Sequence, residues 1–344
     1  MDPYNDDALD AFQAPITQDA GLMPPAPSDA RTVLAHVLQH LTTAFVGDAG
    51  GALDTTLTTL AILITKFMCG AFPLRILLVG GTGTGKTRLL HTIAAITGLP
   101  STILPVTQVA ESSWAGLQLG EVARTLHPDL FTRRGPSGRI IAPEDVIRRP
   151  CCLLLDEIDK LSLVTPDRQP MDGAARAWRL GRQQTLLACL DPLSELPTRL
   201  EDVDGVVRLS LANSIVMSAG AFAMFGPTEV VTPVGLVGTG YTPELVDRLG
   251  VVLTMPQPSA AARHQIASVS AADMLAFART LDVDVQGVDA LLAHMPAPGA
   301  PGADYVGIRG MRHEVERVIA DAIATAIARS ESLVRVDVIE PGAP

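Results

Sequence analysis

Apolar residues near the start of the chain recur at helical spacing. Steps of three and four positions relate Val33, Leu34, Val37, Leu38 and Leu41. Ser28 or Asp29 is a suitable N-cap for this helix, and a second helix is expected over about residues 53–67. Residues 1–28 combine Asp with Pro and cannot bury enough surface to offset the entropy of ordering, so they are expected to form a disordered tail.

After Pro73 the pattern changes to short apolar runs separated by turn signals. The runs span residues 76–79, 102–106, 152–155, 215–217 and 251–253. Runs that are apolar throughout are typical of strands buried on both faces, and helical segments lie between them. The sequence therefore predicts an α/β fold with a five-stranded parallel sheet flanked by helices.

A second, smaller domain is expected after Pro256 and Pro258 interrupt the chain. Helices are predicted over residues 260–280, 288–294 and 310–330, and a strand over residues 333–339. The expected organisation is an acidic, Pro-rich tail over residues 1–28, a large α/β domain over 29–257 and a small helical lid domain over 258–344.

Composition narrows the classes of function. The chain is 47% hydrophobic but only 4% aromatic, and its net charge of -11 without a run of Lys and Arg lacks the footprint of a dedicated nucleic-acid binder. The most apolar stretch, residues 57–80, is interrupted by Lys66, Pro73 and Arg75, so no membrane helix is expected. The acidic N-terminus does not resemble a signal peptide, and the four cysteines lack metal-ligand spacing. A cytoplasmic protein with buried thiols is therefore expected.

The strongest chemical signal is a glycine-rich segment between a predicted strand and a predicted helix. It reads Gly80, Gly81, Thr82, Gly83, Thr84, Gly85, Lys86 and Thr87. This matches the phosphate-loop pattern GxxxxGK followed by Ser or Thr, in which backbone N–H groups surround the phosphates of a bound nucleotide. Lys86 would then contact the β- and γ-phosphates of ATP, and Thr87 would bind Mg²⁺. The alternative is a glycine-rich turn that binds no ligand.

A second signal ends the predicted strand 152–155, where Asp156 and Glu157 follow three leucines. Carboxylates at the carboxyl end of a parallel strand face the edge of the sheet at which nucleotides bind. Asp156 would hold Mg²⁺ through water, and Glu157 would act as the general base on the attacking water. The alternative is a pair of surface acids at the start of the next helix.

Together with the phosphate-loop segment, residues 153–161 resemble AAA+ ATPases of the Clp type, and among them the ClpX unfoldases. Further similar blocks follow in the same order, so the resemblance covers roughly residues 30–340. They span residues 45–48, 181–187, 218–223, 242–249 and 307–312. The resemblance implies an AAA+ nucleotide-binding domain with a helical lid.

The resemblance also implies roles for individual residues. Val46 lies in the segment that covers the adenine base, and Arg248 is the arginine finger that reaches a neighbouring subunit's γ-phosphate. Arg309 reaches from the lid to the nucleotide, and Ser218 orients the attacking water, with Asn213 as a less well placed candidate. Outside this resemblance, Arg248 would be a solvated charge and Arg309 a salt-bridge partner at a helix end.

The chain departs from the ClpX pattern where ClpX contacts its partners. The aromatic pore residue falls near Gln118, so Trp114 is either a displaced pore residue or a side chain that packs against the following helix. A zinc-binding module and the Ile-Gly-Phe peptidase-docking tripeptide are missing, which makes a ClpP-type peptidase a doubtful partner. The loop over residues 196–204 is acidic instead of basic.

The expected function is ATP-dependent remodelling or unfolding of a protein partner by a ring of identical subunits, a hexamer. ATP and Mg²⁺ are the implied ligands. Two alternatives remain at this point. One is a nucleic-acid motor or loader that uses Arg133, Arg134 and Arg139, and the other is a nucleotide-gated scaffold that hydrolyses ATP slowly.

Overall fold

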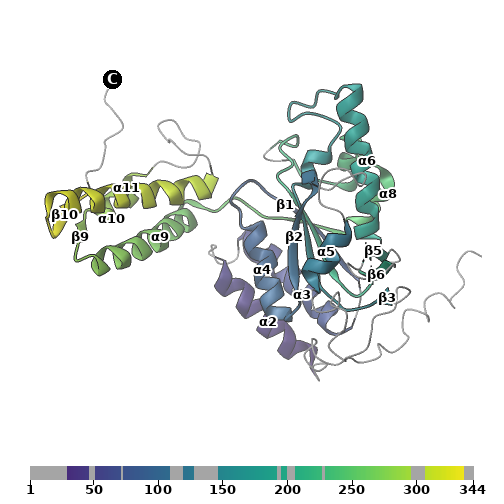
Figure 1. Cartoon of the computed structure of the whole chain (residues 1–344), viewed down its shortest axis with the longest axis horizontal. Helices are drawn as coiled ribbons and strands as arrows, with labels where there is room; N and C mark the ends of the chain where they lie inside the picture. Colours follow the sequence, from purple (N-terminus) through teal and green to yellow (C-terminus); the bar gives the residue numbers. More distant parts are fainter. Residues whose placement is uncertain are drawn as a thin grey trace, which may run out of the picture.

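The computed structural model describes residues 29–45, 51–70, 73–108, 119–127, 146–191, 195–199, 206–226, 229–295 and 307–336. The described elements form a larger α/β lobe and a smaller, mostly helical lobe (Figure 1). Within these ranges, no helix is both long enough and apolar enough to cross a membrane. The expected tail over residues 1–28 lies outside the described residues.

The larger lobe is built on a five-stranded sheet in which every strand pair is parallel. Its strands are β1 (Leu74–Val79), β2 (Ser101–Pro105), β4 (Cys152–Asp156), β7 (Ile215–Gly220) and β8 (Val251–Thr254). The order across the sheet is β2-β4-β7-β1-β8, which places β1 between β7 and β8. The predicted fold class and all five predicted strands are confirmed.

Helices cover both faces of this sheet, because successive residues of each strand point to opposite sides and both sides are apolar. Along β1, Ile76 and Leu78 pack with three helices on one face, whereas Leu77 and Val79 pack with the helices on the other. The first face carries α2 (Ala30–Ala44), α3 (Ala52–Met68) and α4 (Lys86–Thr97). The second carries α5 (Leu119–Leu126), α6 (Gly173–Leu190), α7 (Pro233–Gly238) and α8 (Pro243–Arg248) (Figure 1).

A second sheet, which the sequence did not predict, lies beside the second face. It has the order β3-β6-β5, with β3 (Val146–Ile147), β6 (Val206–Ser210) and β5 (Glu195–Arg199). Strands β5 and β6 pair antiparallel, so part of the expected acidic loop over residues 196–204 is a strand. Two short 3₁₀ helices, η1 (Val106–Gln108) and η3 (Ile158–Leu161), follow β2 and β4.

The smaller lobe has its own apolar core. It comprises α9 (Ala260–Thr280), β9 (Asp284–Gln286), α10 (Val288–His294), α11 (Gly307–Arg329) and β10 (Leu333–Arg335). Helices α9 and α11 pack together through residues such as Ala271, Val315 and Ile319. The predicted helices are confirmed, whereas the short strand β9, which pairs with β10, was missed. Residues 337–339 of the predicted last strand lie outside the described residues.

The cysteines differ in part from the prediction. Cys151, Cys152 and Cys189 are buried and Cys69 is exposed, and all four are free thiols. Burial raises the pKa of Cys151 to about 11 and that of Cys152 and Cys189 to about 12. The expectation of buried thiols is therefore wrong for Cys69.

Candidate functional site

The glycine-rich segment forms a tight loop between the end of β1 and the start of α4. Gly83 and Gly85 have φ values of 80° and 93°, in the left-handed region that glycine adopts most readily. A Cβ on Gly85 would lie 2.7 Å from Cε1 of Phe45, and one on Gly80 would lie 2.7 Å from the carbonyl oxygen of Met255. The loop is therefore enclosed by the strand end after β8 and by the ring of Phe45, and larger residues do not fit there.

Lys86, the first residue of α4, folds over this loop. Its Nζ donates hydrogen bonds to the carbonyl oxygens of Gly80, at 2.6 Å, and Gly81, at 2.8 Å. Burial lowers the pKa of Lys86, and the carboxylates of Asp156 and Asp159 partly oppose this effect. The ammonium group and the acids after β4 thus act on one another electrostatically, as expected if they share one site.

The hydroxyl groups of the loop lie in three different environments. Thr84 is buried and its Oγ1 donates to the carbonyl oxygen of Gly81 at 3.0 Å, so this side chain holds the loop together. Thr87 is partly buried in the first turn of α4, and Thr82 is exposed. Thr87 is therefore the hydroxyl that remains suited to a metal ion.

The two acids predicted at the end of β4 occupy different positions. Asp156 is the last residue of the strand and is partly buried, whereas Glu157 is exposed and has a φ of 61°, which is unusual for a residue with a side chain. The backbone N–H of Glu157 donates to Oδ1 of Asp156 at 2.8 Å. Thr107 in η1 donates through Oγ1 to Oε2 of Glu157 at 3.1 Å.

Thr107 is a site residue that the sequence analysis missed. It is fifty positions from Glu157 in the chain, and only the parallel pairing of β2 with β4 brings the ends of the two strands together. The strand that carries the acids is not a direct neighbour of the strand before the glycine-rich loop, because β7 lies between β1 and β4.

Ser218 lies inside β7 and not at its end, because the strand continues to Gly220. It pairs with Leu77 of β1 and Leu155 of β4, so it lies one residue position before the level of Asp156 along the sheet. Its side chain is fully buried, and its Oγ has no hydrogen-bond partner among the described residues. Asn213, the other candidate, lies in the turn before β7, at the opposite edge of the sheet.

Arg248 is the last residue of α8 and is 35% exposed. Its Nη2 contacts Oδ2 of Asp191 at 3.1 Å, and its Nη1 donates to the carbonyl oxygen of Glu244 at 3.2 Å. It is therefore not simply a solvated charge. Asp191 was not singled out by the sequence analysis, because an aspartate at a helix end is common and its partner is 57 positions away.

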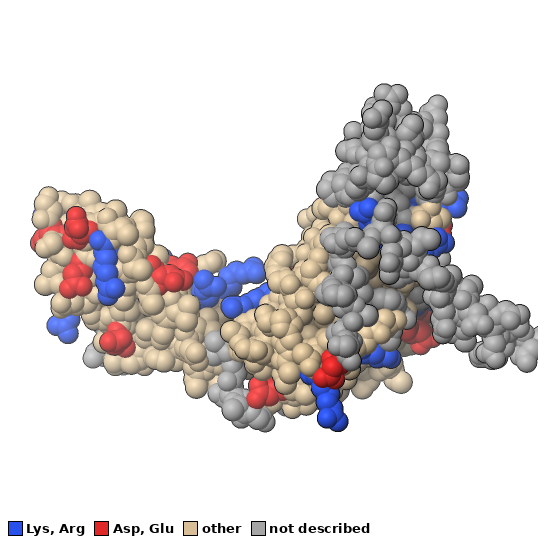
Figure 2. Space-filling model, turned by 90° about the horizontal axis from the view of Figure 1, so that it is seen from below, with Lys and Arg blue, Asp and Glu red and all other residues tan. Residues whose placement is uncertain are grey.

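Arg309 lies at the start of α11, where the smaller lobe meets the phosphate loop. A Cβ on Gly83 would lie 3.1 Å from the backbone nitrogen of Ile308 and 3.4 Å from that of Arg309. The side chain of Arg309 is exposed. Figure 2 shows Lys and Arg side chains facing the hollow between the two lobes. The structure thus brings Arg309 to the predicted phosphate site.

Some predicted features lie outside the described residues. Val46 is one of them, but the preceding residue, Phe45, contacts the loop near Gly85, and the guanidinium of Arg88 lies 5.9 Å from its ring centroid. Trp114 and the arginines considered for nucleic acid (Arg133, Arg134 and Arg139) are also outside. Their roles stay predictions.

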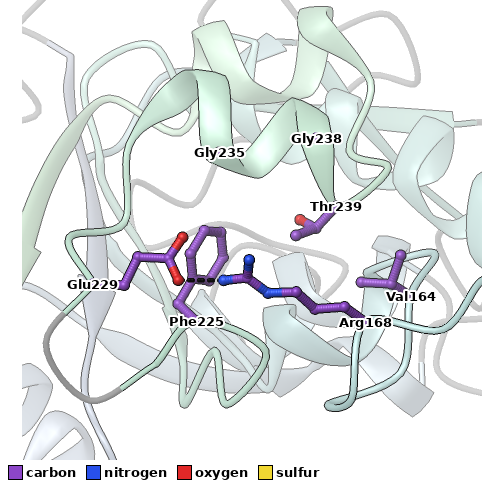
Figure 3. A pocket seen from close by; sticks show the side chains of 7 residues that line it. All are labelled: Val164, Arg168, Phe225, Glu229, Gly235, Gly238 and Thr239. Carbon is purple, nitrogen blue, oxygen red and sulfur yellow. Dashed lines mark hydrogen bonds and ion pairs between the residues drawn. The ribbon is translucent and has the colours of Figure 1, made fainter.

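A cavity of about 260 Å³ lies elsewhere, between the turn around residues 164–168 and α7 (Figure 3). The guanidinium of Arg168 pairs there with the carboxylate of Glu229. The Cζ atom of Arg168 lies 5.9 Å from the ring centroid of Phe225. Gly235 and Gly238 of α7 contribute backbone to the lining. The cavity contains none of the predicted site residues, so the candidate site is located by the phosphate loop and not by cavity volume.

Comparison with known protein families agrees with this geometry. The model of the ATPase family associated with various cellular activities (AAA) matches residues 76–248, which is half of the chain. The match begins in β1 before the phosphate loop and ends at Arg248, so it includes Lys86, Asp156 and Glu157. Proteins of this family are P-loop ATPases that generally bind ATP with Mg²⁺. The chain belongs to the AAA family of ATPases.

Proposed function

We propose that the chain hydrolyses ATP to ADP and phosphate in a ring of its own copies, a hexamer, and uses the reaction to remodel or unfold a protein partner. The observation that carries the ring is the position of Arg248. The phosphate loop follows the carboxyl end of β1, whereas Arg248 precedes β8, whose first residue, Val251, pairs with Ile76 near the start of β1. The six residues of β1 span about 20 Å. Arg248 therefore lies toward the opposite edge of the sheet and would serve a neighbouring copy.

The loop fits the triphosphate of a nucleotide. A Cβ on Gly80 would lie 2.7 Å from the backbone carbonyl oxygen of Met255, so this position needs glycine and presents bare backbone. Lys86 adds a positive charge at the loop, and the N-terminus of α4 adds its positive dipole end. Phe45 lies beside the loop at the start of the segment proposed to cover the base.

Asp156 and Thr87 fit Mg²⁺, because a carboxylate and a hydroxyl are oxygen ligands of the kind this ion prefers. When bound, Mg²⁺ neutralises negative charge on the β- and γ-phosphates. Val46 would contribute to the base-covering segment. The residues proposed to bind ATP and Mg²⁺ are therefore Gly80 to Thr87, Asp156 and Val46.

Within the site, Glu157 would accept the proton of the attacking water while the water oxygen bonds to the γ-phosphorus and the bond to ADP breaks. Thr107 orients the carboxylate of Glu157 through its hydrogen bond. Arg248 of the neighbouring copy would neutralise charge that develops on the γ-phosphate. Arg309 would contact the nucleotide from the smaller lobe, and Ser218 is the proposed sensor of the attacking water.

Protein remodelling is supported by the resemblance to Clp-type proteins, which extends beyond the ATPase core into the smaller lobe. A ClpP-type peptidase stays a doubtful partner, because the chain lacks the docking tripeptide. The segment between Phe225 and Tyr241, which would carry it, includes the short helix α7. No described residue favours a nucleic-acid motor, since the arginines considered for it lie outside the described ranges. The proposed location is the cytoplasm.

The test is the ATPase rate as a function of protein concentration, with light scattering on the same samples. We expect the rate per chain to rise as the chain assembles, and unfolded protein to stimulate it further. Stimulation by single-stranded DNA alone would replace the proposed function by a nucleic-acid motor. A slow rate that neither ligand changes would favour the nucleotide-gated scaffold, and full activity in a monomer would exclude the ring.

A further inference from the structure

Helix α6 contacts helix α8 at both ends of α8 (Figure 1). At the N-terminal end of α8, Oε1 of Gln183 accepts a hydrogen bond from the backbone N–H of Thr242 at 2.8 Å. At the C-terminal end, Oδ2 of Asp191 accepts one from Nη2 of Arg248 at 3.1 Å. Since α8 is only six residues long, these two contacts determine where Arg248 lies.

Asp191 is itself fixed in position. Its backbone N–H closes the last turn of α6 on the carbonyl oxygen of Leu187 at 2.8 Å. The preceding carbonyl, that of Leu190, accepts a hydrogen bond from Nε of Arg75 at 3.0 Å. Arg75 is a buried residue of β1 that also donates to the carbonyl oxygens of Leu211 and Ser214. The carboxylate of Asp191 therefore stands at the end of a helix that is anchored to the central sheet.

The chain that follows Arg248 is equally constrained. Gly250 has a φ of 77°, and a Cβ on it would lie 2.2 Å from the carbonyl oxygen of Arg75. This close approach fixes the segment between α8 and β8 against β1. Arg248 thus projects from a backbone that has little freedom to move, and only its own side-chain torsions remain to be set.

The contacts of the Arg248 guanidinium leave part of it available. A guanidinium has five N–H donors, and among the described residues Asp191 and the Glu244 carbonyl engage two of them. The side chain of Arg248 is 35% exposed and that of Asp191 is 26% exposed, so the pair lies at the surface of the lobe. A planar guanidinium held along one edge presents its other edge in a defined direction.

We propose that Asp191 is a positioning residue for Arg248, whose guanidinium it holds in the orientation that meets the nucleotide of the neighbouring copy. The proposal rests on the proposed function, in which Arg248 acts between copies. A long side chain that is oriented before assembly loses less rotamer freedom when it binds a phosphate. Asp191 supplies this orientation, because its carboxylate contacts the guanidinium from a fixed helix end.

Asp191→Asn keeps the shape of the side chain but removes its charge. We expect kcat to fall about ten- to a hundredfold, the effect of a misplaced catalytic group. The KM for ATP stays unchanged, because the phosphate loop of the same copy is untouched. Asp191→Glu keeps the charge and recovers most of kcat. Asp321→Asn is the matched control, because it removes the partner of Arg317 on the smaller lobe at 2.9 Å, and it keeps the full rate.

Mixed rings identify the copy in which the defect acts. In mixtures with Glu157→Gln, whose finger is intact, the active sites of Asp191→Asn copies receive a correctly held Arg248, and their rate rises. In mixtures with Arg248→Ala, neither copy offers a correctly held finger, and the rate does not exceed the sum of the two. A purely structural defect in Asp191→Asn would not distinguish these two mixtures.

Two results overturn the proposal. One is a kcat for Asp191→Asn equal to that of the unchanged chain. The other is a lowered kcat that mixing with Glu157→Gln does not restore, whatever the stability of the variant. If Arg248→Ala alone keeps the full rate, Arg248 is not an arginine finger and that part of the proposed function fails. If Arg248→Ala is inactive and is restored by mixing while Asp191→Asn is unaffected, only the role of Asp191 fails.

Discussion

Gly85 combines two constraints, a left-handed backbone and a close neighbouring ring. Its φ is 93°, and a Cβ would lie 2.7 Å from Phe45. Gly98, at the end of α4, has a φ of 66° but no atom within 4 Å of such a Cβ. The two glycines therefore separate the cost of the backbone conformation from the cost of the contact.

We expect Gly98→Ala to lower the free energy of unfolding by about 1–2 kcal/mol, the cost of a left-handed residue with a side chain. Gly85→Ala should cost more and should also weaken ATP binding, because Phe45 must move away from the loop. Denaturant unfolding and nucleotide titration of both variants measure this. Equal losses of stability, with ATP affinity unchanged, would show that Phe45 does not constrain the loop.

The cysteines give a second prediction at the scale of the residue. Cys69 is exposed, whereas Cys151, Cys152 and Cys189 are buried, and burial raises the pKa of each buried thiol to about 11 or 12. Only the thiolate reacts with alkylating reagents. At pH 8 the folded chain should therefore react quickly at one cysteine, and mass spectrometry after digestion should find the label on Cys69. Rapid labelling of a second thiol would contradict the packing of the sheet.

At the scale of the element, Gln183 of α6 connects η3 to the start of α8. It is fully buried, and its Nε2 donates to the carbonyl oxygens of Leu161, at 2.9 Å, and Gly240, at 3.1 Å. Its Oε1 accepts from the N–H of Thr242. One side chain thus satisfies three backbone groups from segments that are far apart in the sequence.

Gln183→Leu keeps the approximate volume of the side chain but removes its hydrogen bonds to these three backbone groups. We expect a loss of about 3 kcal/mol in the free energy of unfolding, since each buried unsatisfied group costs about 1–3 kcal/mol. The neighbouring Gln184 is exposed, and Gln184→Leu should change stability by less than about 0.5 kcal/mol. Urea unfolding of both variants tests the difference, and equal stabilities would refute the assigned role of Gln183.

The same scale shows why some elements could be predicted and others could not. The five strands of the main sheet are apolar runs bounded by turns, which is why they could be predicted. The central strands β4, β7 and β1 are buried along almost their whole length, whereas the edge strands β2 and β8 are only partly buried. The end of β7 was misplaced because Ser218, Ala219 and Gly220 are small and do not continue an apolar run. Strand β3 was missed because it has only two residues, and strands β5 and β6 were missed because they are short and contain charged residues such as Glu195 and Arg208.

The candidate site shows the same division. The placement of the glycine-rich loop between a strand and a helix, and of Asp156 and Glu157 at the end of a strand, could be predicted, because both features are local in sequence. Thr107 and Asp191 could not, because each acquires its partner only through tertiary packing, fifty or more positions away. Such contacts are set by strand order and by the packing of α6 against α8, and neither leaves a local sequence signal.

At the scale of the whole molecule, two lobes meet at the phosphate loop. The backbone at the start of α11 approaches Gly83, so the smaller lobe contacts the loop that would hold the phosphates. A change at the phosphates can therefore alter the contact between the lobes. Arg248 lies toward the other edge of the sheet, where it is accessible to another copy. In the proposed function, these two edges carry the two halves of a composite site.

The central claim is that each ATP is hydrolysed with an arginine from a neighbouring copy. Its most direct test is the ATPase rate of Arg248→Ala mixed with Glu157→Gln, two variants that we expect to be inactive when each is measured alone. The account predicts that activity appears on mixing, because Arg248→Ala sites then receive an intact finger from Glu157→Gln copies, and that both variants bind ATP. If the mixture stays inactive while light scattering shows mixed assemblies, Arg248 does not act between copies.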